Sequence, residues 1–230
     1  MRSLLKRWEQ LPQELQNDSV RPYYEALSRK RGQLLLKRVF DILLSLVLLV
    51  LLSPVMLILA LAIRLDSPGE VLFRQVRVTQ YGREFRIFKF RTMVANAQQL
   101  GTQVTVQGDM RITRVGKLLR KCRLDELPQL LNILMGQMSF VGTRPEVPRY
   151  VRQYTPQMLA TLLLPAGVTS QASIRYKDED RLLDNSSDPD RTYVEQVLPG
   201  KMEYNLNSML DFSLWQDLKT MVQTVGAVLH

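Results

Sequence analysis

Two residue types that carry much of enzyme chemistry are nearly missing from this chain of 230 residues. It has one cysteine, Cys122, and one histidine, the C-terminal His230. These numbers exclude a disulfide framework and a zinc site built from His and Cys clusters. A Ser-His-Asp or Cys-His mechanism would depend on the terminal histidine. Acid, base or nucleophilic chemistry is therefore expected from carboxylates, and Cys122 is interpreted as a small buried residue.

Acidic residues are also outnumbered, with 22 Asp and Glu against 31 Lys and Arg and a net charge of +9. This excess favours an anionic partner such as nucleic acid, lipid headgroups or a phosphorylated substrate. Charge alone does not choose among the three. With about 150 residues as the usual length of a domain, the chain is one large domain or one domain with an added element.

One long segment has almost no charge. From Val39 to Ile63 the sequence is apolar and only Asp41 is ionisable. As a helix, these roughly 25 residues would extend about 37 Å, enough to span a bilayer. The segment begins too late for a signal peptide and no cleavage site follows it. Asp41 follows Arg38 and Lys37 by three and four positions, which predicts an ion pair near the membrane interface.

Ser53-Pro54 interrupts the apolar segment. Proline lacks the backbone donor and clashes with the preceding turn, so we expect a sharp kink between two arms, 39–52 and 55–63. A spanning helix normally has its basic excess on one side, but here basic residues flank both ends: Arg29, Lys30, Arg31, Lys37 and Arg38 before it, and Arg64, Arg74 and Arg77 after it. The pattern favours a re-entrant helix over an ordinary kinked transmembrane helix.

The predicted organisation has three parts: an extension over 1–33, the membrane helix over 34–66 and a larger domain over 67–230. The extension is either an interfacial amphipathic helix or a flexible tail. The fold class is α/β, mostly helical with a small β-hairpin, in a monotopic membrane protein. Turn residues and apolar periodicity predict strands at 71–78 and 84–91, and helices at 94–100, 115–121, 125–135, 146–163, 188–206 and 214–229.

The second predicted strand alternates aromatic and cationic residues between Glu84 and Arg91, with a slip near Phe88. Such a strand can stack on nucleobases. More often it is half buried with one solvated face, and we do not expect nucleic acid as the partner.

Asp125 and Glu126 form the candidate chemical centre. Pro128 fixes a helix start just after them, where negative charge and phosphate are both favoured. They are surrounded in sequence by cationic residues: Arg111, Arg114, Lys117, Arg120, Lys121, Arg123, Arg144 and Arg149. Adjacent residues do not face each other as a glycosidase pair does. A carboxylate among guanidinium groups suits phosphoryl transfer, whereas the alternative is a helix-capping Asp with surface ion pairs.

Five motifs stand in order along the chain: Lys37-Arg38-x-x-Asp41; the apolar run broken by Ser53-Pro54; Lys89-Phe90-Arg91-Thr92-Met93; Leu118-Leu119-Arg120-x-x-Arg123-Leu124-Asp125-Glu126-Leu127-Pro128-Gln129-Leu130-x-Asn132; and Met138-Ser139-x-Val141-Gly142-x-Arg144-Pro145-Glu146. Over residues 33–228 the chain resembles the monotopic polyprenyl-phosphate phosphoglycosyl transferases, the bacterial sugar transferase family. The resemblance implies transfer of a sugar 1-phosphate from a nucleoside diphosphate sugar, commonly of uridine, to undecaprenyl phosphate, releasing the nucleoside monophosphate.

The resemblance also implies roles for individual residues. Asp125 would be the nucleophile that forms a phosphosugar intermediate and would contact Mg²⁺, with Glu126 beside it for metal or proton handling. Substrate-binding residues would be Arg91, Arg120, Arg123, Gln129, Arg144 and Pro145, of which the last two form the loop that meets the nucleotide sugar. Ser53-Pro54 would turn the re-entrant helix.

The family further implies a bacterial cytoplasmic membrane location, with the catalytic domain facing the cytosol. The reaction would be the first membrane step of exopolysaccharide, O-antigen or glycoconjugate assembly, and an oligomer is possible. Two departures concern the loops and the sugar preference: Thr143 replaces a usual Pro, and 165–170 has an inserted Ala and a Ser for a second Gly. The alternative function is a non-catalytic basic membrane adaptor, which has no reason to keep the Asp125-Glu126 pair.

Overall fold

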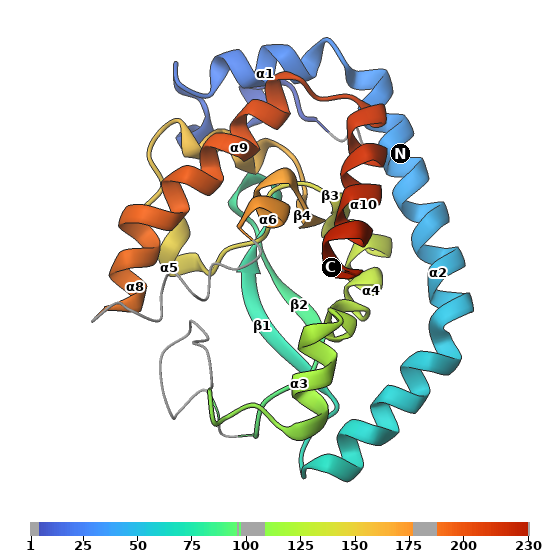
Figure 1. Cartoon of the computed structure of the whole chain (residues 1–230). Coiled ribbons are helices and arrows are strands. Elements are labelled where there is room, and N and C mark those ends of the chain that lie inside the picture. The colour runs from blue at the N-terminus through green and yellow to red at the C-terminus, as the bar shows by residue number, and fades with distance from the viewer. Residues whose placement is uncertain (1–4, 96, 98–108, 177–187, 230) are drawn as a thin grey trace.

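The computed structural model describes residues 5–95, 97, 109–176 and 188–229. These residues form a mostly helical structure around an antiparallel hairpin, β1 (Leu72–Val78) and β2 (Glu84–Phe90) (Figure 1). A second small sheet pairs β3 (Met138–Val141) with β4 (Ala166–Thr169) in parallel. The predicted class, mostly helical with small sheets and one long apolar helix, is confirmed.

Helical segments of very different lengths surround the two sheets. In chain order they are η1 (Trp8–Gln10), η2 (Gln13–Leu15), α1 (Arg21–Ser28), α2 (Arg31–Asp66), η3 (Gln80–Gly82), α3 (Arg114–Lys121), η5 (Leu124–Glu126), α4 (Gln129–Leu134), α5 (Pro148–Val151), η6 (Met158–Leu163), α6 (Gln171–Arg175), α8 (Pro189–Thr192), the π-helical turn η7 (Tyr193–Val197), α9 (Leu198–Leu210) and α10 (Leu214–Leu229).

Several predicted helices are found close to their expected ranges. The helices predicted at 115–121 and 214–229 are α3 and α10, and the one at 188–206 is the run from α8 to α9. The helix predicted at 125–135 is α4 preceded by the turn η5, with Gly136 at a positive φ of 78° just beyond it. The helix predicted at 94–100 lies mostly outside the described residues.

The continuous helix predicted over 146–163 is wrong. The segment contains only the single turn α5 and the 3₁₀ segment η6. Pro156 separates them, because the residue before a proline is disfavoured in the helical conformation. The parallel pair β3–β4 was not predicted. It brings Gly142 so close to Gly167 that a Cβ on Gly167 would lie 2.2 Å from the Gly142 nitrogen.

Helix α2 is continuous from Arg31 to Asp66, with Pro54 inside it, and changes direction near its middle (Figure 1). Pro54 has no N–H for the carbonyl of Val50, four residues earlier. The hydroxyl of Ser53 donates to this carbonyl instead, at 2.8 Å. The Ser-Pro pair therefore bends the helix while leaving no unpaired carbonyl, which suits an apolar surrounding.

One face of α2 packs against the protein and the rest is bare. Leu48, Leu49 and Leu52 pack with Ile87 and Leu130 beneath the hairpin. In the most apolar 18-residue window of α2, only 6% of the residues are buried. The exposed apolar side chains include Leu43, Leu46, Val47, Val50, Leu51, Leu57, Ile58, Leu61 and Leu65. The helix is long and apolar enough to cross a membrane, and its bare face suits contact with lipid.

Polar contacts hold the beginning of α2 to the rest of the molecule. The ammonium of Lys37 lies 2.5 Å from a carboxylate oxygen of Asp217 on α10. Arg38 donates to the last carbonyls of α4, and Asp41 accepts from the backbone N–H of Phe140 at 3.2 Å. The predicted ion pair of Asp41 with Lys37 or Arg38 is therefore replaced by contacts between elements.

The N-terminal extension is part of the core from residue 5 onward. Its apolar side chains are buried together with residues of η6 and α9: Leu5, Leu11, Leu15, Val20, Tyr23, Tyr24 and Leu27 on one side, and Leu162, Leu163, Leu206 and Met209 on the other. A flexible tail is excluded for this segment. Helix α1, which lies before the predicted boundary at residue 33, also contacts α9.

We expect Leu27→Ala to lower the free energy of unfolding by about 2 to 5 kcal/mol, because it removes a fully buried side chain from the contact between the extension and α9. Denaturant unfolding in detergent, followed by tryptophan fluorescence, measures this change. Ser19→Ala, at an exposed position of the same segment, is the matched control. Equal stability of the two variants would mean that the extension does not support the fold.

Candidate active site

The two candidate carboxylates lie in the short turn η5 between α3 and α4. The chain enters this turn through Arg123, which has left-handed backbone angles of φ 56° and ψ 20°. Such a conformation is unusual for a residue other than glycine and often occurs at functional sites. It ends α3 abruptly and places Asp125 and Glu126 against the β-hairpin.

Glu126 is surrounded by cationic side chains. Its carboxylate accepts from the Lys89 ammonium at 3.0 Å and from both terminal nitrogens of Arg144, and it lies 3.9 Å from Arg123. Burial opposes the negative charge, but Arg144 and Lys89 outweigh burial and hold the pKa of Glu126 well below its ordinary value. Glu126 is therefore ionised at neutral pH and fully used in ion pairs.

Asp125 lies next to Glu126 but has a different environment. It is 8% exposed, and none of the described residues forms a hydrogen bond or ion pair with its carboxylate. Burial raises the pKa of Asp125 above its ordinary value, although Lys89 opposes the shift. The pair thus consists of one carboxylate fixed by cations and one available for reaction.

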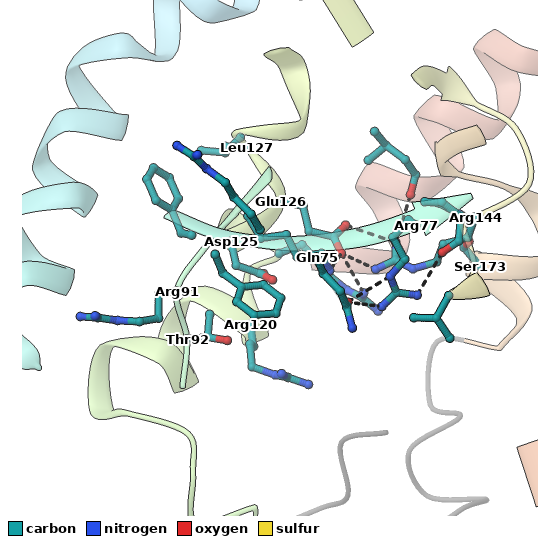
Figure 2. A pocket seen from close by; sticks show the side chains of 18 of the residues that line it. Gln75, Arg77, Arg91, Thr92, Arg120, Asp125, Glu126, Leu127, Arg144 and Ser173 are labelled. Carbon is teal, nitrogen blue, oxygen red and sulfur yellow. Dashed lines mark hydrogen bonds and ion pairs between the residues drawn. The ribbon is translucent and has the colours of Figure 1, made fainter. Parts of the chain in front are cut away.

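Both carboxylates line a cavity of about 1730 Å³. Leu48 and Leu52 of α2 contribute to its wall, as do Lys201 of α9 and Thr224 of α10. Arg120, Arg123, Arg144 and Pro145 also line it. The structure therefore brings these four predicted residues to the same cavity as Asp125 and Glu126, and Figure 2 shows Arg120 and Arg144 with the two carboxylates.

Arg91 lines the cavity but points away from the carboxylates (Figure 2). Its guanidinium donates to the carbonyls of Ser67 and Pro68 just beyond α2, at 2.6 and 2.9 Å. We interpret Arg91 as the residue that fixes the end of α2 rather than as a phosphate ligand.

Gln129 is also placed differently from the prediction. It is only 1% exposed, does not line the cavity, and its amide has no hydrogen-bond partner among the described residues. Its position does not support direct contact with substrate.

Lys89 is a site residue that sequence reasoning did not assign. The predicted slip near Phe88 is absent, because β1 and β2 pair in regular register from Leu72↔Phe90 to Val78↔Glu84. Lys89 therefore shares the buried face of β2 with Phe85 and Ile87. The available signal was a cation at a half-buried position on the strand face that also carries Phe85 and Ile87.

The donor atoms of the site fit one kind of metal. Among the described residues, no group of three or more His, Cys, Asp and Glu could hold a metal ion. Asp125 offers a carboxylate without a protein partner, whereas Glu126 is occupied by cations. One carboxylate suits Mg²⁺, which is commonly bound by one or two carboxylates, substrate phosphates and water.

Comparison with known proteins assigns the chain to a family. The model of the family described as "Bacterial sugar transferase" matches residues 32–230. The chain belongs to this family.

Three curated relatives show how far the similarity extends. The chain is 39% identical over 197 residues to the UDP-N-acetylgalactosamine-undecaprenyl-phosphate N-acetylgalactosaminephosphotransferase of Aeromonas hydrophila, covering 84% of this chain and 44% of the relative. It is 36% and 37% identical to the UDP-glucose:undecaprenyl-phosphate glucose-1-phosphate transferases of Caulobacter vibrioides and Escherichia coli, covering 85% and 83% of this chain and 70% and 39% of those relatives. The matched region is therefore less than half the length of the relatives from Aeromonas hydrophila and Escherichia coli.

We expect Glu126→Gln to destabilise the fold by about 2 to 4 kcal/mol at neutral pH, since it leaves Lys89 and Arg144 without their buried counter-charge. The folded-state pKa of Glu126 lies below its unfolded value. Its stabilising contribution is thus complete above the ordinary range of a carboxyl group and is lost as pH falls through the folded-state pKa. Denaturant unfolding of both proteins from pH 7 to pH 3 measures the difference, and a difference that does not shrink in acid would contradict this account.

Proposed function

We propose that the chain transfers a sugar 1-phosphate from a nucleoside diphosphate sugar, most simply a uridine diphosphate hexose, to undecaprenyl phosphate. The observation that carries the proposal is the unpaired carboxylate of Asp125 in a cation-lined cavity that reaches the apolar helix α2. The names of the relatives support the donor and the acceptor, since they specify UDP-sugars and undecaprenyl phosphate.

In the first step, a carboxylate oxygen of Asp125 attacks the phosphorus that bears the sugar. The new bond joins Asp125 to this phosphorus while the bond to the bridging oxygen breaks. The electron pair stays on that oxygen, and nucleoside monophosphate leaves. Arg120, Arg123 and Arg144 line the same cavity and stabilise the phosphate charges.

In the second step, an oxygen of the lipid phosphate attacks the phosphorus of the aspartyl intermediate. The bond to Asp125 breaks, its carboxylate is restored, and the sugar leaves on a lipid diphosphate. A covalent intermediate lets a soluble donor and a membrane-bound acceptor use one site in turn. Leu48 and Leu52 place the apolar helix at the wall of this cavity, the side from which a lipid arrives.

We assign Glu126 a positioning role, because its carboxylate is already engaged by cations and its lowered pKa keeps it from donating a proton near neutral pH. Asp125 would hold Mg²⁺ together with the substrate phosphates. The ion, when bound, supplies charge neutralisation at the diphosphate.

For the membrane, we propose that α2 is re-entrant at the cytoplasmic membrane of a bacterium, with the catalytic domain on the cytosolic side. The bend of α2 and the basic residues at both of its ends support this arrangement. The reaction would then begin the assembly of a surface polysaccharide or other glycoconjugate.

Asp125→Asn should lower nucleoside monophosphate release by about a thousandfold or more, because it removes the nucleophile. The assay uses detergent-solubilised protein, Mg²⁺, undecaprenyl phosphate and a panel of uridine diphosphate sugars labelled in the sugar. Without acceptor, the unmodified protein should retain label covalently and the variant should not. Turnover that survives in the folded variant would refute the mechanism, and inactivity of the unmodified protein with every donor would favour an adaptor.

Re-entrant topology predicts that both ends of α2 face the same side of the membrane as the catalytic domain. The expectation that Cys122 is buried is wrong, because this free cysteine is exposed. Labelling of Cys122 in the unmodified chain therefore reports on which side of the membrane the catalytic domain lies. In a Cys122→Ser background, Arg29→Cys and Pro68→Cys report the two ends, both at exposed positions. An impermeant maleimide should label all three from the same side of sealed vesicles, whereas opposite labelling of the two ends would establish a span.

A further inference from the structure

Arg77 of the β-hairpin lines the cavity although it belongs to none of the predicted motifs. Arg77 lies opposite Phe85 in the ladder, and Gln75 lies opposite Ile87. Directly opposed residues share one face of an antiparallel pair. Gln75 and Arg77 therefore lie on the same face as Lys89, the residue that binds Glu126, and both line the cavity.

The guanidinium of Arg77 is held in a fixed orientation. Its Nε and one terminal nitrogen donate to the side-chain oxygen of Gln75, at 3.0 and 2.7 Å. The other terminal nitrogen donates to the carbonyl of Pro145 at 3.1 Å. Arg77 is thereby tied to the same loop that carries Arg144, and Figure 2 shows the two arginines close together.

A network of largely buried side chains that also line the cavity lies next to Arg77. Glu146 lies 3.9 Å from Arg77 and accepts from the hydroxyl of Tyr193, which also accepts from Lys201 at 3.1 Å. Glu146, Tyr193 and Lys201 are each at least 93% buried. Tyr193 begins the π-helical turn η7, a rare feature that often marks functional sites.

The charges around Arg77 favour an anion. Glu126 is shared by three cations, and Glu146 is the one carboxylate of the described residues within 4 Å of Arg77. Burial lowers the pKa of Arg77, Glu146 opposes this shift, and the smaller effect of the nearby Arg144 charge adds to it. Two like charges held side by side in a partly dehydrated cavity repel each other, and a phosphate beside both would relieve the repulsion.

We propose that Arg77 binds the phosphate of the nucleoside monophosphate that leaves in the first step, next to Arg144. The inference rests on the proposed function and extends it to a residue of β1. Arg144 contacts Glu126 beside the nucleophile, so it lies nearer the phosphorus that is attacked, whereas Arg77 lies further along the cavity toward Glu146. The electron pair released on bond cleavage goes to the phosphate at Arg77.

Direct binding of UMP to the full chain in detergent tests this role without any need for turnover. Arg77→Met should weaken UMP binding by about tenfold to a hundredfold, because it removes a charge-assisted contact. Arg77→Lys keeps the positive charge but lacks the planar guanidinium group that Gln75 orients. This variant should bind UMP with intermediate affinity. Arg86→Met is the matched control, because Arg86 is exposed on β2 and does not line the cavity.

Isothermal titration with UMP and thermal unfolding of each variant separate binding from folding. If Arg77→Met is folded and binds UMP as the unmodified protein does, the proposed role is overturned, and Arg77→Lys provides the same decision if the Met variant fails to fold. Binding that depends on Arg77 in a protein that releases no UMP from any donor would uphold a nucleotide-phosphate site at Arg77 but overturn the transfer reaction, and with it the leaving-group role. An unmodified protein that binds no UMP would overturn both.

Discussion

The ion cluster around Glu126 is the interaction on which the site depends. This carboxylate joins three segments that are distant in sequence: Lys89 from β2, its own turn η5, and Arg144 from the loop after β3. Without the central negative charge, Lys89 and Arg144 would repel each other. Burying Glu126 is costly in itself. Its ion pairs offset that cost, and they place Lys89 and Arg144 beside the unpaired Asp125.

Sequence patterns predicted the elements that depend on neighbouring residues. The hairpin, α3 and α10 follow from alternation, helical periodicity and turn residues, all of which are local. The parallel pair β3–β4 escaped prediction because each strand has four residues, too few to show alternation, and because the partners lie far apart along the chain. Pro156 breaks the expected helix over 146–163, because the residue before a proline is disfavoured in the helical conformation.

The same limit applies to the site. The ordered motifs indicated Asp125, Glu126 and Arg144, which the structure brings to one cavity. Motifs identify residues but not the direction in which their side chains point. Arg91 lies at the end of β2, where the carbonyls beyond α2 need donors, and it turns toward them. The expected slip in strand register near Phe88 would place Lys89 on the solvated face, whereas the regular register of β1 and β2 places it on the face toward Glu126.

Helix α2 is fixed at both ends. Lys37 and Arg38 tie its beginning to α10 and α4, and the carboxylate of Asp66 at its end accepts from the backbone N–H of Val115 in the first turn of α3, at 3.0 Å. The helix cannot slide along its axis without moving these elements. In a bilayer, the depth of its bare face then sets the height of Asp125 above the hydrocarbon layer. For the proposed lipid acceptor, whose phosphates occupy a plane of nearly constant height, this fixed depth would align acceptor and site before they meet and reduce their search to two dimensions.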